Sequence, residues 1–486
     1  MLGSKSFREK LSKADVALTF RDVVILPGFT EVEPNEVNVA TKATRNYRLN
    51  IPLISSPMDT VTESEMAISL ARQGGLGVLH RNCTIKEQVE MAKKVKKAES
   101  FIIRDVVTIS PKNSVSEAIM LMEKYHISGL PVVDGEKLVG IVTGRDVRFT
   151  DPKLKIKDVM TRDVITAPES ISIEEAKELL QKHRIEKLPV VDSSGRLKGL
   201  ITVKDIMLRG RFPNAVRDED GRLLCAAAVS PFDLERAKAL DEYVDIIVID
   251  VAHFHNKRCF KATKKLLKVV SADVVVGNIG TYEAAEDIIT KLDDIAGLRV
   301  GIGSGSICTT MEVVKAGSPT LYATAQVADA VAEYGADMPI IADGGIRNPG
   351  DVAVALAVGA SAVMMGNVFA GCKESPGELV AIGGRYYKRY RGMASPSARA
   401  KRYAIDRYQI AKGIVEGVEG WVPYRGDVAS VVEEFINGLK AAMGYAGARN
   451  IEELREKARL VLLTDAGSKE AKPHSILLPS ETQFES

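Results

Sequence analysis

The stretch Ile340-Ile-Ala-Asp-Gly-Gly-Ile-Arg-Asn-Pro-Gly-Asp-Val-Ala-Val-Ala-Leu-Ala-Val358 contains a complete strand, loop and helix. Ile340–Ala342 is a short apolar run typical of a buried strand, and Val352–Val358 is suited to a buried helix. Asp343 and two glycines form a polar turn between them. Another apolar run follows at Ala362–Met365. This order predicts parallel strands that are connected by helices.

The same alternation recurs on both sides of this stretch. Seven runs rich in apolar residues are predicted as strands: Ile51–Ser55, Gly77–Leu79, Asp245–Ile249, Asp273–Val276, Leu298–Val300, Ile340–Ala342 and Ala362–Met365. Most are followed by a glycine-rich or polar turn and then by a helical pattern. The number of repeats favours a (β/α)₈ barrel, the TIM barrel of the α/β class, over an open sheet.

The composition limits the classes of protein. A chain of 486 residues exceeds what one hydrophobic core usually holds, so two or three domains are expected. Its 66 basic and 64 acidic residues nearly cancel, which gives no global reason to bind nucleic acid or a membrane surface. Met1 to Phe20 lacks the apolar core of an export signal, and the scattered cysteines form no disulfide or zinc pattern. We expect a cytoplasmic protein, and we expect the uncharged stretch Val352–Cys372 to be a buried helix and strand rather than a membrane span.

An internal repeat interrupts the barrel pattern. Asp105–Pro111 recurs as Asp163–Pro168, and Ile127–Asp134 recurs as Ile185–Asp192 at the same offset. Each copy is predicted as a strand, a helix, two strands joined by a turn, and a second helix, which makes two βαββα units. The predicted first helices of the copies are Val115–Tyr125 and Ile173–His183. We predict a barrel from residues 1–97 and 214–486, interrupted near its second helix by units at 98–155 and 156–213.

This repeat resembles the paired cystathionine-β-synthase (CBS) domain, a family known for binding adenine or guanine nucleotides and regulating the protein that carries it. The family's Thr-x-x-Asp element matches Thr143 with Asp146 and Thr202 with Asp205. The resemblance implies that each hydroxyl meets a phosphate of ATP or GTP and that each carboxylate accepts hydrogen bonds from ribose hydroxyls. The alternative is that these residues only cap the helices that follow them.

Residues that follow the barrel strands are the expected site of chemistry, because active sites of such barrels lie at the carboxyl ends of the strands. The loop Gly301–Thr310 fails as a dinucleotide fingerprint, since Ser306 stands where the third glycine belongs. We interpret it as a loop whose backbone groups converge on an ion or phosphate, with Cys308 placed as a nucleophile. An inert buried cysteine is the alternative.

Two further segments indicate a nucleotide ligand and a lid. Gly366-Asn367 and the glycines after Asp343 lie in loops that receive a phosphate in many barrels. A phosphate would repel the Asp343 carboxylate. We therefore expect this carboxylate to accept hydrogen bonds from the ribose hydroxyls. A long polar run follows Tyr390–Ser395 and contains Asp406-Arg-Tyr-Gln409. Such a run is typical of a lid, which we place at about residues 394–415.

Together these loops resemble the inosine-5′-monophosphate (IMP) dehydrogenase family. The matching segments, besides the CBS pair, are Ser55–Thr62, Gly74–Gly77, Gly303–Cys308, Ala342–Ile346, Tyr390–Met393, Asp406–Tyr408 and Glu416–Gly420. The resemblance implies that the Cys308 thiolate adds to C2 of IMP, that hydride passes to NAD⁺, and that the covalent intermediate is hydrolysed to xanthosine monophosphate for guanine nucleotide biosynthesis.

The resemblance also implies roles for individual residues. Catalysis is implied for Cys308, Thr310, Tyr408 and Arg407, the last as the base that activates water. Substrate binding is implied for Ser56, Met58, Ser306, Asp343, Gly345, Gly366, Asn367, Tyr390, Gly392, Met393 and Glu416. Binding of NAD⁺ is implied for Asp250, Asn278, Gly301 and Gly303. A K⁺ ion is implied on the carbonyls of Gly303, Gly305 and Cys308, together with those of Glu470, Ala471 and Lys472 from a neighbouring subunit of a homotetramer, with an octamer left open.

Several residues depart from the family pattern, namely Ala394, Val251, Pro396, Arg399, Val415 and Lys472. Two other functions therefore stay open. A guanosine monophosphate (GMP) reductase would share the barrel and the cysteine but would deaminate GMP with NADPH. The pair Arg407-Tyr408 favours the dehydrogenase, because hydrolysis needs a base. A nucleotide sensor with weak turnover is the second alternative, motivated by Ala394 and Val251.

Overall fold

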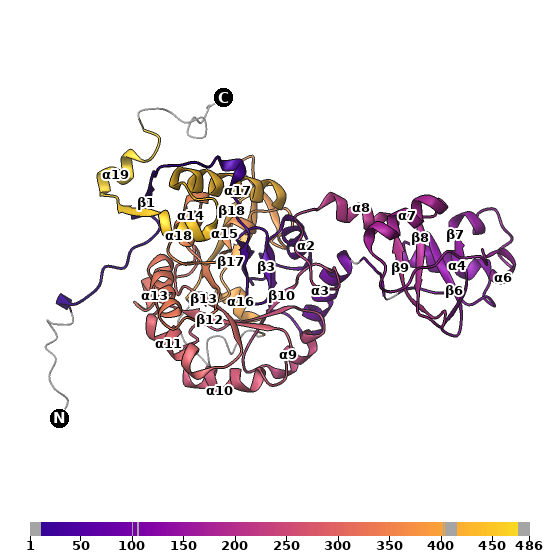
Figure 1. Cartoon of the computed structure of the whole chain (residues 1–486). Helices are drawn as coiled ribbons and strands as arrows, with labels where there is room; N and C mark the ends of the chain where they lie inside the picture. The colour runs from indigo at the N-terminus through magenta and orange to yellow at the C-terminus, as the bar shows by residue number, and fades with distance from the viewer. Residues whose placement is uncertain (1–10, 100, 105, 402, 404–415, 475–486) are drawn as a thin grey trace. The chain divides into compact units, whose positions relative to one another are not determined.

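The computed structural model describes residues 11–99, 101–104, 106–401, 403 and 416–474. The chain divides into two compact units (Figure 1). The barrel unit is made of Met1–Val95, Asn214–Val216 and Leu224–Ser486, and the inserted unit of Lys96–Pro213 and Arg217–Leu223. The chain thus passes back into the inserted unit once more after residue 216, whereas the sequence analysis expects a single return near residue 214.

Eight parallel strands close the barrel in the order β10-β11-β12-β13-β14-β15-β4-β5. Their bounds are β4 (Leu53–Ser55), β5 (Leu76–Leu79), β10 (Ala226–Val229), β11 (Ile246–Ile249), β12 (Asp273–Ile279), β13 (Ile295–Val300), β14 (Ile340–Asp343) and β15 (Ala362–Met365). The cylinder closes where β15 pairs with β4, with Val363 opposite Leu53. The predicted (β/α)₈ barrel is confirmed.

Strand β10 is the barrel strand that the sequence analysis misses. Its four residues are three alanines and Val229, and alanine is depleted in strands because it offers little side chain to pack. All four are buried, and β10 pairs with β11 on one side and β5 on the other. Pairing with β11 and β5, rather than an intrinsic strand propensity of its residues, therefore stabilises β10.

Helices follow the barrel strands along the chain. They are α2 (Ser64–Gln73), α3 (Ile85–Ala98), α9 (Leu234–Asp241), α10 (Lys257–Leu266), α11 (Tyr282–Lys291), α13 (Thr320–Glu333), α14 (Pro349–Ala357) and α17 (Val428–Ala446). The uncharged stretch Val352–Cys372 contains most of α14 and all of β15, and both are largely buried, as predicted. Within the described ranges, no helix combines the length and the apolar character needed to cross a membrane.

Smaller elements surround the barrel. Strand β1 (Val23–Leu26) pairs with β19 (Arg459–Leu462), β2 (Thr41–Lys42) pairs with β3 (Arg48–Leu49), and β16 (Leu379–Ile382), β17 (Arg385–Arg391) and β18 (Glu419–Pro423) form a separate sheet. The short helices are η1 (Pro34–Glu36), α12 (Thr310–Val313), α15 (Asn367–Ala370), α16 (Pro396–Ala400), α18 (Ile451–Lys457) and α19 (Asp465–Glu470). The pairing of β17 with β18 brings the predicted site segments around Tyr390 and Glu416 side by side, since Tyr390 lies opposite Gly420.

The inserted unit consists of two similar halves. Their elements are α4 (Val115–Tyr125), β6 (Gly129–Asp134), β7 (Lys137–Thr143), α5 (Gly144–Val147) and α6 (Ile156–Val159), then α7 (Ile173–His183), β8 (Lys187–Val191), β9 (Leu197–Thr202) and α8 (Val203–Arg211). Helices α4 and α7 have the predicted bounds, and each begins at a serine that forms a capping box with a glutamate. The predicted first strand of each copy is reduced to one bridge, Ile109 with Val132 and Ala167 with Val190.

Close packing of β5 against α2 predicts the effect of one substitution. A Cβ atom on Gly77 would lie 2.5 Å from the Cα and 2.7 Å from the Cβ of Ala67. Gly77→Ala should therefore destabilise the barrel unit by about 1–3 kcal/mol, as overpacked cores do, which a shift in the denaturant midpoint will measure. Gly420→Ala is the matched control, because no atom lies within 4 Å of its added Cβ. Equal midpoints for the two variants would contradict this packing.

Candidate functional site

A cavity of about 1050 Å³ lies where the carboxyl ends of the barrel strands meet. Most of the predicted substrate and catalytic residues line it, although they come from loops far apart in the sequence. The predicted residues at its wall are Ser56, Met58, Asn278, Gly301, Gly303, Gly305, Ser306, Cys308, Thr310, Asp343, Gly345, Gly366, Asn367, Tyr390, Gly392, Met393 and Glu416. The structure therefore brings the strand-end loops together at one site.

Some predicted residues do not line the cavity. Asp250 lies behind its wall, where its side chain is 2% exposed. Arg407, Tyr408 and Val415 lie outside the described residues. Glu470 ends α19, and Ala471 and Lys472 follow it, so a role for these three at the cavity depends on a neighbouring subunit.

Cys308 takes part in a chain of three polar groups. Its Sγ lies 3.2 Å from Oγ1 of Thr310, and that hydroxyl donates to Oε2 of Glu416 at 3.0 Å. The backbone holds the same geometry, because Thr309 N–H donates to the carbonyl of Glu416 and Cys308 forms a bridge with Gly417. A proton that leaves the thiol thus has a hydrogen-bonded path to a carboxylate, which is how a nucleophile is activated by a neighbouring base.

The other cysteines lie in the core. No disulfide joins the five cysteines, and all except Cys308 are buried. Burial raises the pKa of the Cys83 thiol to about 11 and that of Cys372 to about 12. Both therefore stay protonated near neutral pH, which makes them poor nucleophiles.

A network of four charged residues, three of them buried, lies in and behind the cavity wall. Arg299 donates to Asp250 Oδ1 at 3.1 Å and to Asp343 Oδ2 at 2.8 Å, so its guanidinium bridges the two carboxylates. Arg81 donates to Asp250 Oδ2 at 3.3 Å. Asn278 Nδ2 donates to the same Asp343 Oδ2 at 2.9 Å. The network is neutral and fully paired, as buried charges must be, and it holds Asp343 in one orientation at the cavity edge.

Arg81 and Arg299 belong to the candidate site but are absent from the residues predicted from the sequence. Arg299 is a charged residue inside the apolar run Leu298–Val300, and a charge in a buried strand requires a partner. This signal was available in the sequence. Arg81 is the second residue after β5, where a charged residue is ordinary, so its burial becomes visible only in the folded chain.

The side-chain amide of Asn278 indicates whether a ligand that carries a carboxamide group fits in this part of the cavity. Its Nδ2 donates to Gly301 O at 2.7 Å as well as to Asp343, while its Oδ1 is buried and has no hydrogen-bond partner among the described residues. A buried acceptor without a donor is costly, and a carboxamide N–H of a ligand would satisfy it. The predicted nicotinamide side of NAD⁺ fits this position.

Gly366 and Tyr390 lie in close contact at the predicted phosphate position. A Cβ on residue 366 would lie 2.5 Å from the Tyr390 hydroxyl, so only glycine allows this approach. The hydroxyl donates to Met58 Sδ at 3.7 Å. Burial raises the pKa of Tyr390, so the group stays a hydrogen-bond donor over the working range of pH.

Two departures from the family pattern lie in the cavity wall. Val251 is buried beside Asp250 and lines the cavity as an apolar surface. Ala394 also lines the cavity, and its methyl group faces Gly417, where a Cβ would lie 3.4 Å from it.

The threonine and aspartate pairs of the inserted unit bond to each other. Thr143 donates to Asp146 through both its N–H and its hydroxyl, at 2.7 and 2.8 Å, and thereby caps α5. Thr202 donates to Asp205 through its hydroxyl, and the same hydroxyl accepts the Asp205 N–H at 3.3 Å, which caps α8. Burial raises the pKa of Asp205 above its ordinary value. These bonds show that each threonine and aspartate pair has the capping role that was the alternative to nucleotide binding.

Comparisons with known proteins agree with this geometry. A family described as IMP dehydrogenase / GMP reductase domain matches residues 17–474. An inosine-5′-monophosphate dehydrogenase from Korarchaeum cryptofilum is 57% identical over 469 residues, covering 96% of this chain and 98% of that protein. One from Methanocaldococcus jannaschii is 51% identical, covering 98% of both. A solved GMP reductase from Trypanosoma brucei, a cysteine-to-alanine variant in complex with guanosine 5′-monophosphate, matches with a TM-score of 0.87 and 37% identity, covering 96% of this chain and all of that one.

The difference in exposure among the thiols predicts selective labelling. Iodoacetamide at pH 8 should modify Cys308 first, because the other four cysteines are buried and, for Cys83 and Cys372, protonated. Mass spectrometry of the native protein after short exposure will locate the label. Cys308→Ser should lack the fast-labelled site, and fast labelling of another cysteine in that variant would show that the assigned burial is wrong.

Proposed function

The chain belongs to the IMP dehydrogenase / GMP reductase family, and from this premise we propose that it oxidises IMP through a covalent bond to Cys308. Relatives that are more than half identical over nearly the full chain are inosine-5′-monophosphate dehydrogenases. The chain is accordingly an NAD-dependent oxidoreductase of guanine nucleotide synthesis. The observation that carries the chemical proposal is the hydrogen-bonded chain from Cys308 through Thr310 to Glu416.

The first stage of the reaction is oxidation. The thiol proton of Cys308 moves through the Thr310 hydroxyl to Glu416, and the thiolate adds to the electrophilic C2 of IMP. The hydride from C2 then passes to NAD⁺, leaving a thioimidate bond between Sγ and the purine. Asp343 accepts hydrogen bonds from the ribose hydroxyls, and the donors around Gly366 and Tyr390 bind the phosphate. Asn278, Gly301 and Gly303 form the side on which NAD⁺ binds, and Asp250 supports that side from behind the wall through Arg299.

The second stage is hydrolysis. Water adds to C2, the bond to Sγ breaks, and xanthosine monophosphate leaves while Cys308 recovers its proton. We assign Arg407 as the base that activates the water, with Tyr408 assisting, by the resemblance of Asp406-Arg-Tyr408 to the family. An arginine has a pKa above ~12 in water, so this role requires a site closed to bulk solvent.

We extend the proposal to a K⁺ ion and to a homotetramer. The carbonyls of Gly303, Gly305 and Cys308 would hold the ion, together with Glu470, Ala471 and Lys472 of a neighbouring subunit. The Gly305 carbonyl already accepts the Cys308 N–H at 2.9 Å, which leaves it one further lone pair for a cation. The ammonium group of Lys472 would compete with that ion. An octamer remains the larger assembly to test by mass measurement.

We also propose that the inserted unit is a CBS pair that binds ATP or GTP. Thr143 with Asp146, and Thr202 with Asp205, supply a hydroxyl and a carboxylate at the start of a helix in each half. A nucleotide would replace the bond between each pair. Equilibrium binding of ATP and of GTP to the full chain tests this part.

GMP reductase is the second candidate, because its solved relatives share the fold over nearly the whole chain. Purified protein incubated with IMP and NAD⁺, and separately with GMP and NADPH, distinguishes the two. NADH formation in the first mixture supports the dehydrogenase. NADPH consumption in the second supports the reductase, and turnover in neither mixture supports the nucleotide sensor.

Cys308→Ala should bind IMP and form no NADH, since the adduct that donates the hydride cannot form. Calorimetric titration with IMP measures binding, and absorbance at the NADH band measures turnover. Retained IMP affinity separates the loss of chemistry from a loss of folding. Continued NADH production by this variant would reject Cys308 as the nucleophile.

Arg407→Ala should keep the first burst of NADH and slow the steady state, because the base acts only after oxidation. Removing a general base costs about 10²- to 10⁴-fold in the step it serves. Stopped-flow measurement separates the burst from later turnovers, and Arg385→Ala on β17 is a control arginine outside the site. Equal slowing of burst and steady state would assign Arg407 to another step.

A further inference from the structure

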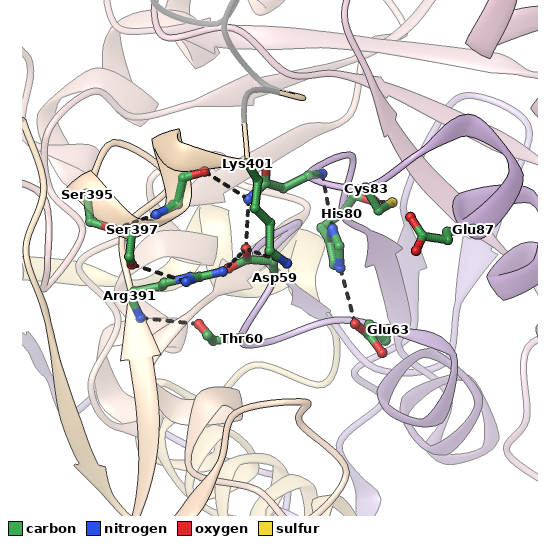
Figure 2. Close-up of polar contacts among 12 residues, drawn as sticks. Asp59, Thr60, Glu63, His80, Cys83, Glu87, Arg391, Ser395, Ser397 and Lys401 are labelled. Carbon is green, nitrogen blue, oxygen red and sulfur yellow. Dashed lines mark hydrogen bonds and ion pairs between the residues drawn. The ribbon is translucent and has the colours of Figure 1, made fainter.

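A cluster of polar side chains just outside the cavity joins three segments of the barrel mouth (Figure 2). Asp59, in the loop after β4, lies at its centre with a side chain that is 1% exposed. Asn82 follows β5, Arg391 ends β17, and Ala398 belongs to α16. We call these four residues the Asp59 clamp, and none of them lines the cavity.

Arg391 and Asp59 form a bidentate ion pair. Arg391 Nε donates to Oδ1 at 3.0 Å, and Nη2 donates to Oδ2 at 2.5 Å. Two parallel bonds from a planar guanidinium fix the orientation of both groups, which a single contact would not do. Burial alone would raise the pKa of Asp59, but the hydrogen bonds from Arg391 and Asn82 and the nearby positive charges hold it below its ordinary value. The carboxylate is therefore charged at neutral pH.

The clamp fixes the segment after β17 from a second side. Asn82 Nδ2 donates to Asp59 Oδ2 at 2.7 Å and to the Ala398 carbonyl at 3.3 Å. Arg391 Nη1 donates to Ser397 Oγ at 3.1 Å. The residues between Arg391 and Ala398 are thus held at both ends by groups that converge on one carboxylate.

Contacts continue from the clamp to the nucleophile loop. Gly392 N–H donates to Val418 O at 3.0 Å, and Val418 N–H donates to Ile307 O at 3.0 Å, next to Cys308. Met393 and Ala394 directly follow Gly392 and line the cavity. A displacement of Arg391 would therefore move the wall that the purine contacts.

We propose that Asp59 is a positioning residue for purine binding, which acts through Arg391 to hold Gly392, Met393 and Ala394 against the base of the nucleotide. The inference rests on the proposed function and extends it to residues outside the cavity. It separates the two ligands, because the proposed NAD⁺ side is supported by Asp250, which pairs with Arg299 and Arg81. A buried ion pair is by itself weak evidence for stability, which favours an orienting role over a purely stabilising one.

Asp59→Asn tests this inference, since it keeps the shape of the side chain and removes its charge. The KM for IMP should rise about ten-fold or more, whereas the KM for NAD⁺ should stay within about two-fold. The Kd for IMP, measured by calorimetry in a Cys308→Ala background, should rise by the same factor. Arg385→Gln is the matched control, because Arg385 begins the same strand and is exposed. It should leave both KM values unchanged.

Arg391→Lys is the second variant. It tests the same ion pair if Asp59→Asn does not fold. A lysine keeps the charge but cannot donate two parallel bonds, so IMP affinity should fall while the melting temperature stays close to that of the unaltered enzyme. The double variant Asp59→Asn/Arg391→Gln should weaken IMP binding no more than Asp59→Asn alone, because the pair acts as one unit.

The outcomes separate the inference from the proposed function. Unchanged IMP affinity in both single variants would overturn the inference, as would an equal loss for IMP and NAD⁺ with a lowered melting temperature. An unaltered enzyme that fails to oxidise IMP with NAD⁺ would instead overturn the proposed function. In that case IMP binding to the Cys308→Ala protein, with and without Asp59→Asn, still tests the clamp.

Discussion

Closure of the barrel between β15 and β4 is the constraint on which the site depends. These strands are about three hundred residues apart in the chain, yet Met365 lies opposite Ser55 in parallel register. Parallel strands all end at the same rim, so the loop after β4 meets the loop after β15. The contact of Met58 with Tyr390, and the clamp of Asp59 on Arg391, both follow from this closure. Without it, the loops after β4 and β15 would share no surface.

Two kinds of contact hold the rim of the barrel in place, namely buried ion pairs and backbone pairing. On one side, Arg299 bridges Asp250 and Asp343, so charges that would be costly alone stabilise one another in the absence of water. On the other side, backbone pairing links Cys308 to Gly417 and β17 to β18. The ion pairs fix Asp343 at the edge of the cavity, and the backbone pairing fixes the segment that carries Cys308. The site is therefore preorganised by groups that do not themselves react.

The inserted unit has its own hydrophobic clusters and is built by local rules. One cluster surrounds Leu130 and Val132, and the other surrounds Leu188 and Val190, at equivalent positions of the two copies. Its helices begin at serine capping boxes, and its hairpins turn at Gly135 and Gly195, which both adopt positive φ. Local signals of this kind are legible in a sequence, which explains why the bounds of α4 and α7 match their predictions.

The sequence by itself determined the alternation of strand and helix, the repeat in the insertion and the loops that carry Cys308, Asp343 and Tyr390. These features depend on periodicity and turn chemistry, which act over a few residues. Tertiary structure alone decided that Ala226–Val229 is a strand, that Arg81 is buried against Asp250, and that Asp59 meets Arg391. Each of these depends on a partner distant in the chain, and neither alanine content nor a charge after a strand indicates which partner it will be. Pairing across the closed barrel supplies that information, because it converts separations of hundreds of residues into hydrogen-bond distances.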